Sequence, residues 1–150
     1  MQKAEELMAK NKFKDAEVLL KTALSQIPDD YAGLLLMASC CVSQNKLSEA
    51  EKYAQDAHSV YPEEPLALSV LGVIRTKKGE YDKALNNFSA YEKALPGNPN
   101  TIYNKAVCYD KMGRKQEAIA EYLRYQNEAP SGEFNELVTS RLTELGYKGP

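Results

Sequence analysis

The side chains in this chain that could carry out chemistry are three cysteines, a single histidine and several pairs of carboxylates. Cys40 and Cys41 are adjacent, and Cys108 lies far along the chain. The histidine, His58, has no cysteine or second histidine at zinc-ligand spacing. The pattern favours three small packing residues in a reducing compartment, and a metal or redox site at the adjacent thiols is the alternative.

The carboxylate pairs do not converge with a base or a nucleophile. They lie at the expected starts of helices, where negative charge complements the helix dipole and stays solvated. The pairs are Asp15/Glu17, Glu49/Glu51 and Glu63/Glu64. No glycine-rich phosphate loop follows a strand. We therefore predict no enzyme activity, no cofactor and no bound metal.

Three series of residues recur every 34 positions, which is typical of a stacked array of repeats. One consists of alanines, one of prolines, and one of residues that readily adopt positive φ. The series are Ala16, Ala50, Ala84 and Ala118; Pro28, Pro62, Pro96 and Pro130; and Asn11, Asn45, Gly79 and Gly113.

The second and third series mark the ends of helices. Asn and Gly suit the left-handed residue after a helix, and proline cannot continue a helix. Between these stops lie two stretches of helical length per period, with apolar residues at helical spacing. The expected first helices are 31–44, 65–78 and 99–112, and the expected second helices are 47–60, 81–94 and 115–128. The chain is predicted to be all-α.

Small residues recur where paired helices must cross closely. Ala38, Gly72 and Ala106 lie on the first helices, and Ala50, Ala84 and Ala118 lie on the second. Helix axes approach to about 8–9 Å only where the side chains at the crossing are small. Since one pair cannot bury its apolar face alone, successive pairs must stack. We expect Leu20, Ala54, Phe88 and Tyr122 to fill the space between pairs.

With these landmarks the chain resembles the tetratricopeptide repeat (TPR) family. The last repeat matches best, through Ala106, Tyr109, Gly113, Ala118, Tyr122 and Pro130. The usual Trp is absent, and Leu34, Leu68 and Ile102 stand in its place. The resemblance implies a right-handed superhelical solenoid of antiparallel helix pairs. It also implies a scaffold or adaptor that binds proteins rather than an enzyme.

We predict a single TPR domain over 1–150 with an incomplete first repeat. Helix A of that repeat would begin before Met1, so we expect the chain to be part of a longer protein. We predict a C-terminal capping helix, with Ser131 as its N-cap and Gly146 as its stop. The predicted parts are a truncated repeat at 1–30, full repeats at 31–64, 65–98 and 99–132, and the capping helix at 133–146.

In the TPR family the first helices of successive repeats line a concave groove that receives a peptide. The positions of these helices not used in packing are mostly apolar here, so the groove is predicted to bind a hydrophobic or amphipathic segment. They are Leu35, Leu36, Ser39 and Val42; Leu66, Ser69, Val70, Val73 and Lys77; and Tyr103, Asn104, Val107, Asp110 and Lys111.

The groove lacks the basic clamp with which one TPR subtype holds a chaperone carboxylate. Its slots hold Glu5, Leu36, Leu66 and Val70. Asn104 matches an Asn that often bonds a ligand backbone in the family. The alternative interpretation is that neighbouring helices, or a segment upstream of Met1, shield Leu35, Leu36 and Val70.

The partner is predicted to be a protein or peptide, and the composition excludes other classes. A net charge of −2 gives no basic stripe for nucleic acid. No apolar run is long enough to span a membrane. Self-association into a homo-oligomer and an accessory role in a larger protein are the alternatives. The unpaired cysteines favour a cytoplasmic location.

Overall fold

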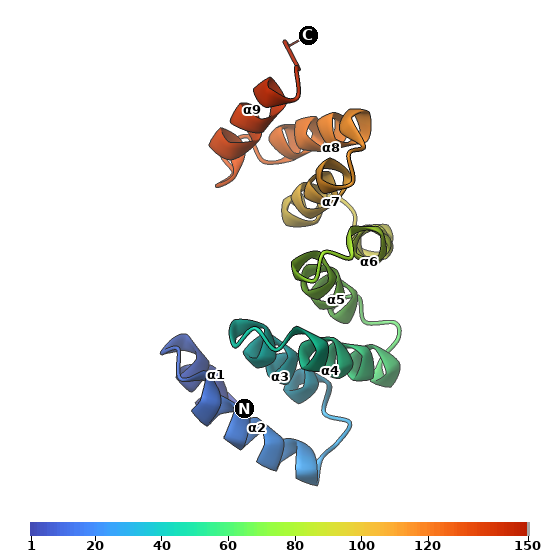
Figure 1. Ribbon diagram of the computed structural model, residues 1–150. Coiled ribbons are helices and arrows are strands. Elements are labelled where there is room, and N and C mark those ends of the chain that lie inside the picture. The colour runs from blue at the N-terminus through green and yellow to red at the C-terminus, as the bar shows by residue number, and fades with distance from the viewer. Residues whose placement is uncertain (150) are drawn as a thin grey trace. The chain divides into compact units, whose positions relative to one another are not determined.

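The computed structural model describes residues 1–149, and every regular element in that part of the chain is an α-helix (Figure 1). The repeat pattern therefore predicted the fold class correctly. The helices are α1 (Gln2–Ala9), α2 (Phe13–Gln26), α3 (Tyr31–Ser43), α4 (Leu47–Val60), α5 (Leu66–Lys77), α6 (Tyr81–Ala94), α7 (Pro99–Lys111), α8 (Lys115–Glu128) and α9 (Asn135–Glu144).

Positive φ at the predicted punctuation positions ends the first helix of each pair. Asn11, Asn45, Gly79 and Gly113 have φ values of 61°, 59°, 81° and 76°. After α3 the Lys46 N–H donates back to the Cys41 carbonyl at 2.8 Å, which satisfies one of the last free carbonyls of the helix. The second helices α2, α4, α6 and α8 all end two residues before a series proline.

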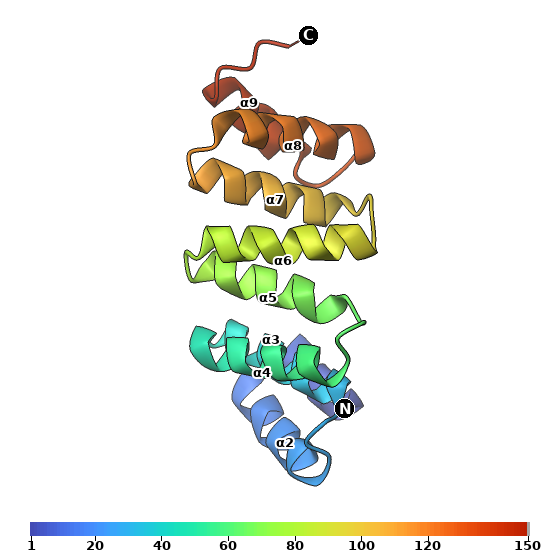
Figure 2. The same cartoon turned by 90° about the vertical axis from the view of Figure 1, so that its right-hand side faces the viewer.

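The chain divides into two compact units, the first Met1–Gly79 and the second starting at Glu80. In the first unit α1 packs on α2, α2 on α3, α3 on α4 and α4 on α5, and α3 also contacts α5. In the second unit α6 packs on α7, α7 on α8 and α8 on α9. Figure 2 shows α6, α7 and α8 of the second unit running side by side. The limits of the individual repeats stay predictions.

The predicted crossing residues are buried. Ala38, Ala50, Ala84, Ala106 and Ala118 are inaccessible to solvent. The residues expected between successive pairs, Leu20, Ala54, Phe88 and Tyr122, are buried as well. Small side chains at the crossings and, except at Ala54, larger ones between pairs are thus part of the core of each unit.

The capping helix begins later than predicted, and Ser131 is not its N-cap. The residue before α9 is Phe134, whose N–H donates to the Tyr125 hydroxyl at 3.1 Å. A turn from Ala129 to Asn135 takes up the intervening residues, because the N–H groups of Gly132 and Asn135 bond within it. The other end is as predicted: Gly146 follows the helix with φ 87°.

Candidate functional site

A groove lies between α3 and α5, the first helices of two successive repeats. It has a volume of about 320 Å³. We call it the α3/α5 groove, and its lining residues are Ser39, Val42 and Ser43 from α3 and Ser69, Val70, Val73 and Ile74 from α5. Five of these seven, Ser39, Val42, Ser69, Val70 and Val73, are among the predicted groove residues. The structure therefore brings them together on one surface.

The walls of the α3/α5 groove are apolar because the helices behind it are packed into the core. Ile74 is inaccessible to solvent, and Val42 and Val70 pack partly against the same core cluster. Val73 is 36% exposed. A ligand can therefore reach branched aliphatic side chains that are already held in place.

Three serines provide the polar atoms of the groove. Ser39 and Ser43 are exposed and Ser69 is half-buried. None of the three hydroxyls has a hydrogen-bond partner within residues 1–149. Each hydroxyl can both donate and accept, so these are the groups that would bond to a polar atom of a ligand.

The apolar surface continues along α5 beyond the groove itself. Leu66, Val70, Val73 and Lys77 follow one another at spacings of four, three and four residues, so they share one face of the helix. Leu66 is 52% exposed, and Lys77 is exposed at the C-terminal end. Within the first unit Leu66, Val73 and Lys77 of this face are exposed, and Val70 is partly covered by the core.

The structure changes the interpretation of two predicted groove residues, Leu35 and Leu36. Leu35 is only 8% exposed and belongs to a core cluster with Leu34, Ala57 and Ala67. A side chain packed in this way cannot line an open groove. Leu36 is half-buried against the core as well. For these two residues, shielding by neighbouring helices is the better interpretation.

A second pocket, of about 470 Å³, lies in the second unit between α7, α8 and α9. We call it the α7/α9 pocket, and it is lined by Tyr103, Val107, Asp110, Lys111, Tyr122, Leu137, Val138 and Arg141. Tyr103, Val107, Asp110 and Lys111 were predicted. Asn104, also predicted, is half-buried and does not line the pocket.

An ion pair lies in the α7/α9 pocket. Arg141 Nε donates to Asp110 Oδ2 and Arg141 Nη2 donates to Asp110 Oδ1, both at 2.7 Å. The Tyr122 hydroxyl also donates to Asp110 Oδ2, at 2.9 Å. These bonds, above all those from Arg141, hold the pKa of Asp110 below its ordinary value. Burial, and then the bond to Asp110, raises the pKa of Tyr122.

The two pockets occupy equivalent places in the repeat, since their lining residues are related by two periods. Val42 corresponds to Asp110 and Val73 to Arg141. Where the first unit has two valines facing an apolar groove, the second has a bidentate ion pair. The α3/α5 groove is therefore the apolar one.

The sequence-based prediction missed the contribution of the capping helix. Leu137 and Arg141 of α9 line the α7/α9 pocket and lie one period after Tyr103 and Val107. Phe134, just before α9, stacks on Tyr103 with ring centroids 4.3 Å apart. Extending the 34-residue register past Pro130 would have identified Leu137 and Arg141.

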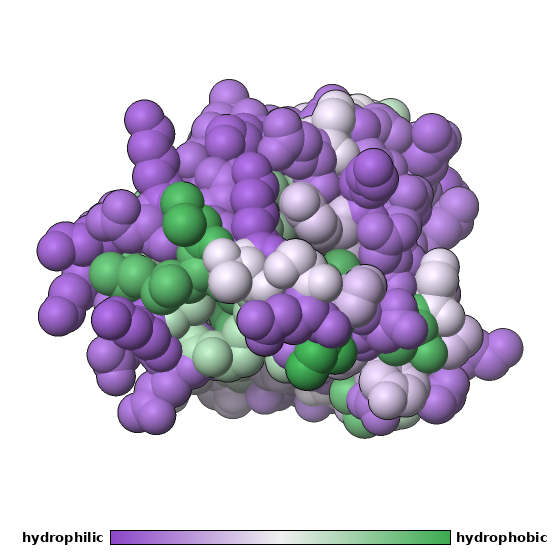
Figure 3. Space-filling view, turned by 90° about the horizontal axis from the view of Figure 1, so that it is seen from below, coloured by the Kyte–Doolittle hydropathy of each residue, from purple (hydrophilic) through white to green (hydrophobic). Residues whose placement is uncertain are grey.

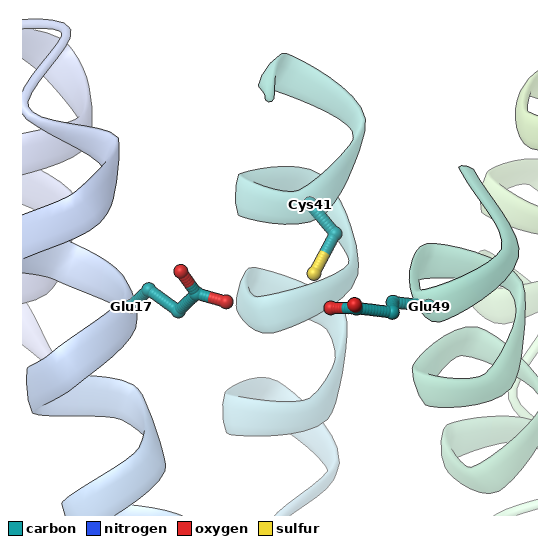
Figure 4. Close-up of side chains that lie close together, drawn as sticks. All are labelled: Glu17, Cys41 and Glu49. Carbon is teal, nitrogen blue, oxygen red and sulfur yellow. The ribbon is translucent and has the colours of Figure 1, made fainter. Parts of the chain in front are cut away.

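Figure 4 shows Glu17 of α2, Cys41 of α3 and Glu49 of α4 pointing toward one another. Their ligand atoms lie within 4.8 Å of one another, a spacing that could suit a metal ion. However, Lys46 Nζ lies 3.2 Å from Glu17 Oε2 and already neutralises that carboxylate. Burial also raises the pKa of Cys41 to about 11, which favours the neutral thiol. Glu17 and Cys41 are buried between α2 and α3, and we assign them to packing, whereas Glu49 is an exposed carboxylate at the start of α4.

The remaining thiols are buried packing groups too. All three cysteines are buried, and none of them forms a disulfide within residues 1–149. Cys40 Sγ donates to the Phe13 carbonyl at 3.0 Å, so it links α3 to the start of α2. Within residues 1–149 no helix is both long and apolar enough to cross a bilayer.

Comparison with known proteins identifies the repeat. A family model described as tetratricopeptide repeat matches residues 7–74 and 75–140. No curated protein matches the sequence.

Solved structures share the fold at low sequence identity. The crystal structure of MamA is 17% identical, with a TM-score of 0.85 over 99% of this chain and 87% of that one. A TPR protein from Parabacteroides merdae is 22% identical, with a TM-score of 0.82 over 96% of this chain and 57% of that one. YrrB, described as a TPR protein with an unusual peptide-binding site, is 18% identical, with a TM-score of 0.81 over 94% and 71%.

Proposed function

Because the chain belongs to the tetratricopeptide repeat family, we propose that it is a non-catalytic adaptor whose α3/α5 groove binds an apolar segment of another protein. The observation that carries the proposal is the groove itself. Val42, Val70 and Val73 form an apolar wall that is open to solvent between two first helices. The peptide-binding site named for YrrB is a property of that protein, and it lends general support to a binding role.

The size of the groove sets the expected affinity. If a ligand covers about 300 Å² of apolar surface, its burial contributes about 7 kcal/mol gross at about 25 cal/mol/Å². The loss of motion on binding and the ordering of the peptide reduce this figure. We expect dissociation constants in the micromolar range or weaker, since a 1 μM constant corresponds to about 8 kcal/mol.

The exposed apolar residues outside the groove give less support for a binding role than the groove does. Figure 3, which looks at the chain from the α2 side of Figure 1, shows a mostly hydrophilic face with small, separated apolar areas. Isolated apolar side chains on a surface are ordinary and carry no function by themselves.

The test is a binding assay with a groove variant and a matched control. Peptides selected from a displayed library on the immobilised chain are labelled and titrated against three forms of the protein by fluorescence anisotropy. Val73→Glu is the groove variant. Val18→Glu is the control, because Val18 is 63% exposed on α2, outside the groove.

We expect Val73→Glu to weaken binding more than about ten-fold, because its carboxylate must be desolvated when the peptide docks. Val18→Glu should leave binding within about two-fold. Both replace an exposed valine, so both should keep the helical circular dichroism spectrum of the parent. Equal effects of the two substitutions would remove the basis for the groove. Dimers in light scattering that disappear in Val73→Glu would identify the occupant as a second copy of the chain.

A further inference from the structure

The walls of the α3/α5 groove carry information about the shape of what fits it. From Leu66 to Lys77 the exposed face of α5 runs for about 17 Å, at 1.5 Å per residue. Its spacing of four, three and four residues is that of a helix seam. On α3 the facing residues Ser39 and Ser43 are small, so a second backbone can approach closely there.

A helical occupant satisfies its own backbone, whereas an extended one does not. An extended segment spanning the same 17 Å has about five residues and therefore about ten backbone donors and acceptors. Against these, the groove walls offer the hydroxyls of Ser39, Ser43 and Ser69. A helix bonds its N–H and C=O groups internally and needs only to present aliphatic side chains to the groove.

The two ends of the groove differ in charge. At the C-terminal end of α5, Lys77 forms no ion pair within residues 1–149, whereas its neighbour Lys78 is paired with Glu51 at 2.5 Å. At the N-terminal end, the loop before α5 carries the exposed carboxylates Glu63 and Glu64. A ligand with complementary ends would place acidic residues beside Lys77 and basic residues beside this loop.

We propose that the occupant is an amphipathic α-helix with an aliphatic stripe, acidic at its N-terminal turn and basic at its C-terminal turn, lying antiparallel to α5. This rests on the proposed function of the groove. The orientation follows from charge, because acidic groups stabilise a helix N-terminus and basic groups its C-terminus. A helix of this kind therefore meets Lys77 with its N-terminal turn. Its own dipole then also opposes that of α5.

The test uses two synthetic 18-residue helical peptides with the same leucine stripe. One has glutamates in its first turn and lysines in its last turn, and the other has these charges exchanged. A third peptide keeps the composition of the first but scrambles the stripe. Each is titrated by fluorescence anisotropy against the parent, Lys77→Glu, Val73→Glu and the control Lys52→Glu, at low and at physiological salt. Lys52 is exposed on α4, away from the groove.

We expect the peptide with the acidic first turn to bind about two- to five-fold tighter than the charge-exchanged one at low salt, which is the range of an exposed ion pair. Lys77→Glu should reverse that preference, Lys52→Glu should keep it, and added salt should shrink it. The bound peptide should be helical by circular dichroism.

The outcomes separate this inference from the proposed function. One outcome overturns the inference and leaves the groove in place. In it the peptides bind and Val73→Glu weakens their binding, but Lys77→Glu leaves the charge preference unchanged. A scrambled peptide that binds as tightly as the first, or a bound peptide without helix, also overturns the inference. Binding that is indifferent to Val73→Glu, or no binding of any peptide, counts against the groove itself.

Discussion

One buried hydroxyl helps to link α8 to α9, and this gives a sharp prediction. Tyr125 is 1% exposed, and its hydroxyl accepts a hydrogen bond from the Phe134 N–H at 3.1 Å. Because Leu137 and Arg141 of α9 line the α7/α9 pocket, this bond helps to set the pocket. Tyr125→Phe leaves the N–H without its acceptor, which should cost about 1 kcal/mol of unfolding free energy.

The same hydroxyl explains why residue 132 is a glycine. A Cβ added at Gly132 would overlap the Tyr125 hydroxyl and would lie 3.0 Å from both Tyr125 Cζ and Ala129 Cβ. The φ of Gly132 is not in the left-handed region, so packing and not the backbone is the obstacle. Gly132→Ala should cost about 1–3 kcal/mol, the usual range for overpacking.

The two substitutions should therefore be coupled. The Tyr125→Phe substitution removes the hydroxyl that a Cβ at residue 132 would overlap. The double variant should therefore lose about 1 kcal/mol less unfolding free energy than the two single variants lose in sum. Urea unfolding followed by circular dichroism measures all four forms. Tyr91→Phe on α6 is the control partner for Gly132→Ala, and that pair should be additive. Additivity of the Tyr125 pair as well, or a neutral Gly132→Ala, would refute the packing described at this turn.

Two further stability predictions concern a helix cap and an ion pair. Asn98 caps α7 by accepting from the N–H groups of Asn100 and Thr101, so Asn98→Ala should lower the unfolding free energy by about 1 kcal/mol, while Asn100→Ala should change it little. The hydrogen bond from Lys78, opposed by burial and aided by Arg75, holds the pKa of Glu51 below its ordinary 4.5. A carboxyl with a lowered pKa stabilises the fold above its unfolded pKa and loses that effect as pH falls through the folded value. The urea concentration at the unfolding midpoint should therefore fall as the pH is lowered below about 4.5. Glu51→Gln should flatten this dependence of the midpoint on pH. The same dependence in parent and variant would contradict the role of the ion pair.

The helices could be predicted from the sequence because each end has a local cause. Asn45 and Gly113 end helices through their own backbone preference, and a proline two residues on ends the others. Such signals do not depend on tertiary contacts. The predicted start of α9 was wrong, because Ser131 lies in a turn before the helix instead of at its N-cap. The hydroxyl of Tyr125 in α8 helps to hold this turn.

The site was predictable in part, for a similar reason. Val70 and Val73 line the groove. They could be predicted because the repeat pattern determines which side of α5 does not pack against neighbouring helices. Leu35 looked equivalent, since α3 is apolar nearly all round, and only the packing around it shows that it is buried. To predict the ion pair between Asp110 and Arg141, one would have to know that α9 lies beside α7, as the first helix of a further repeat would.

We propose the α3/α5 groove as the place where this protein holds its partner. Its most direct test is a titration of the ¹⁵N-labelled chain with a selected peptide, followed by amide chemical shifts. We expect the largest changes at Ser39, Val42, Val70 and Val73, with a further change at Lys77 near the end of α5. Largest changes on α2, α4 or α9, with the groove residues unmoved, would contradict it.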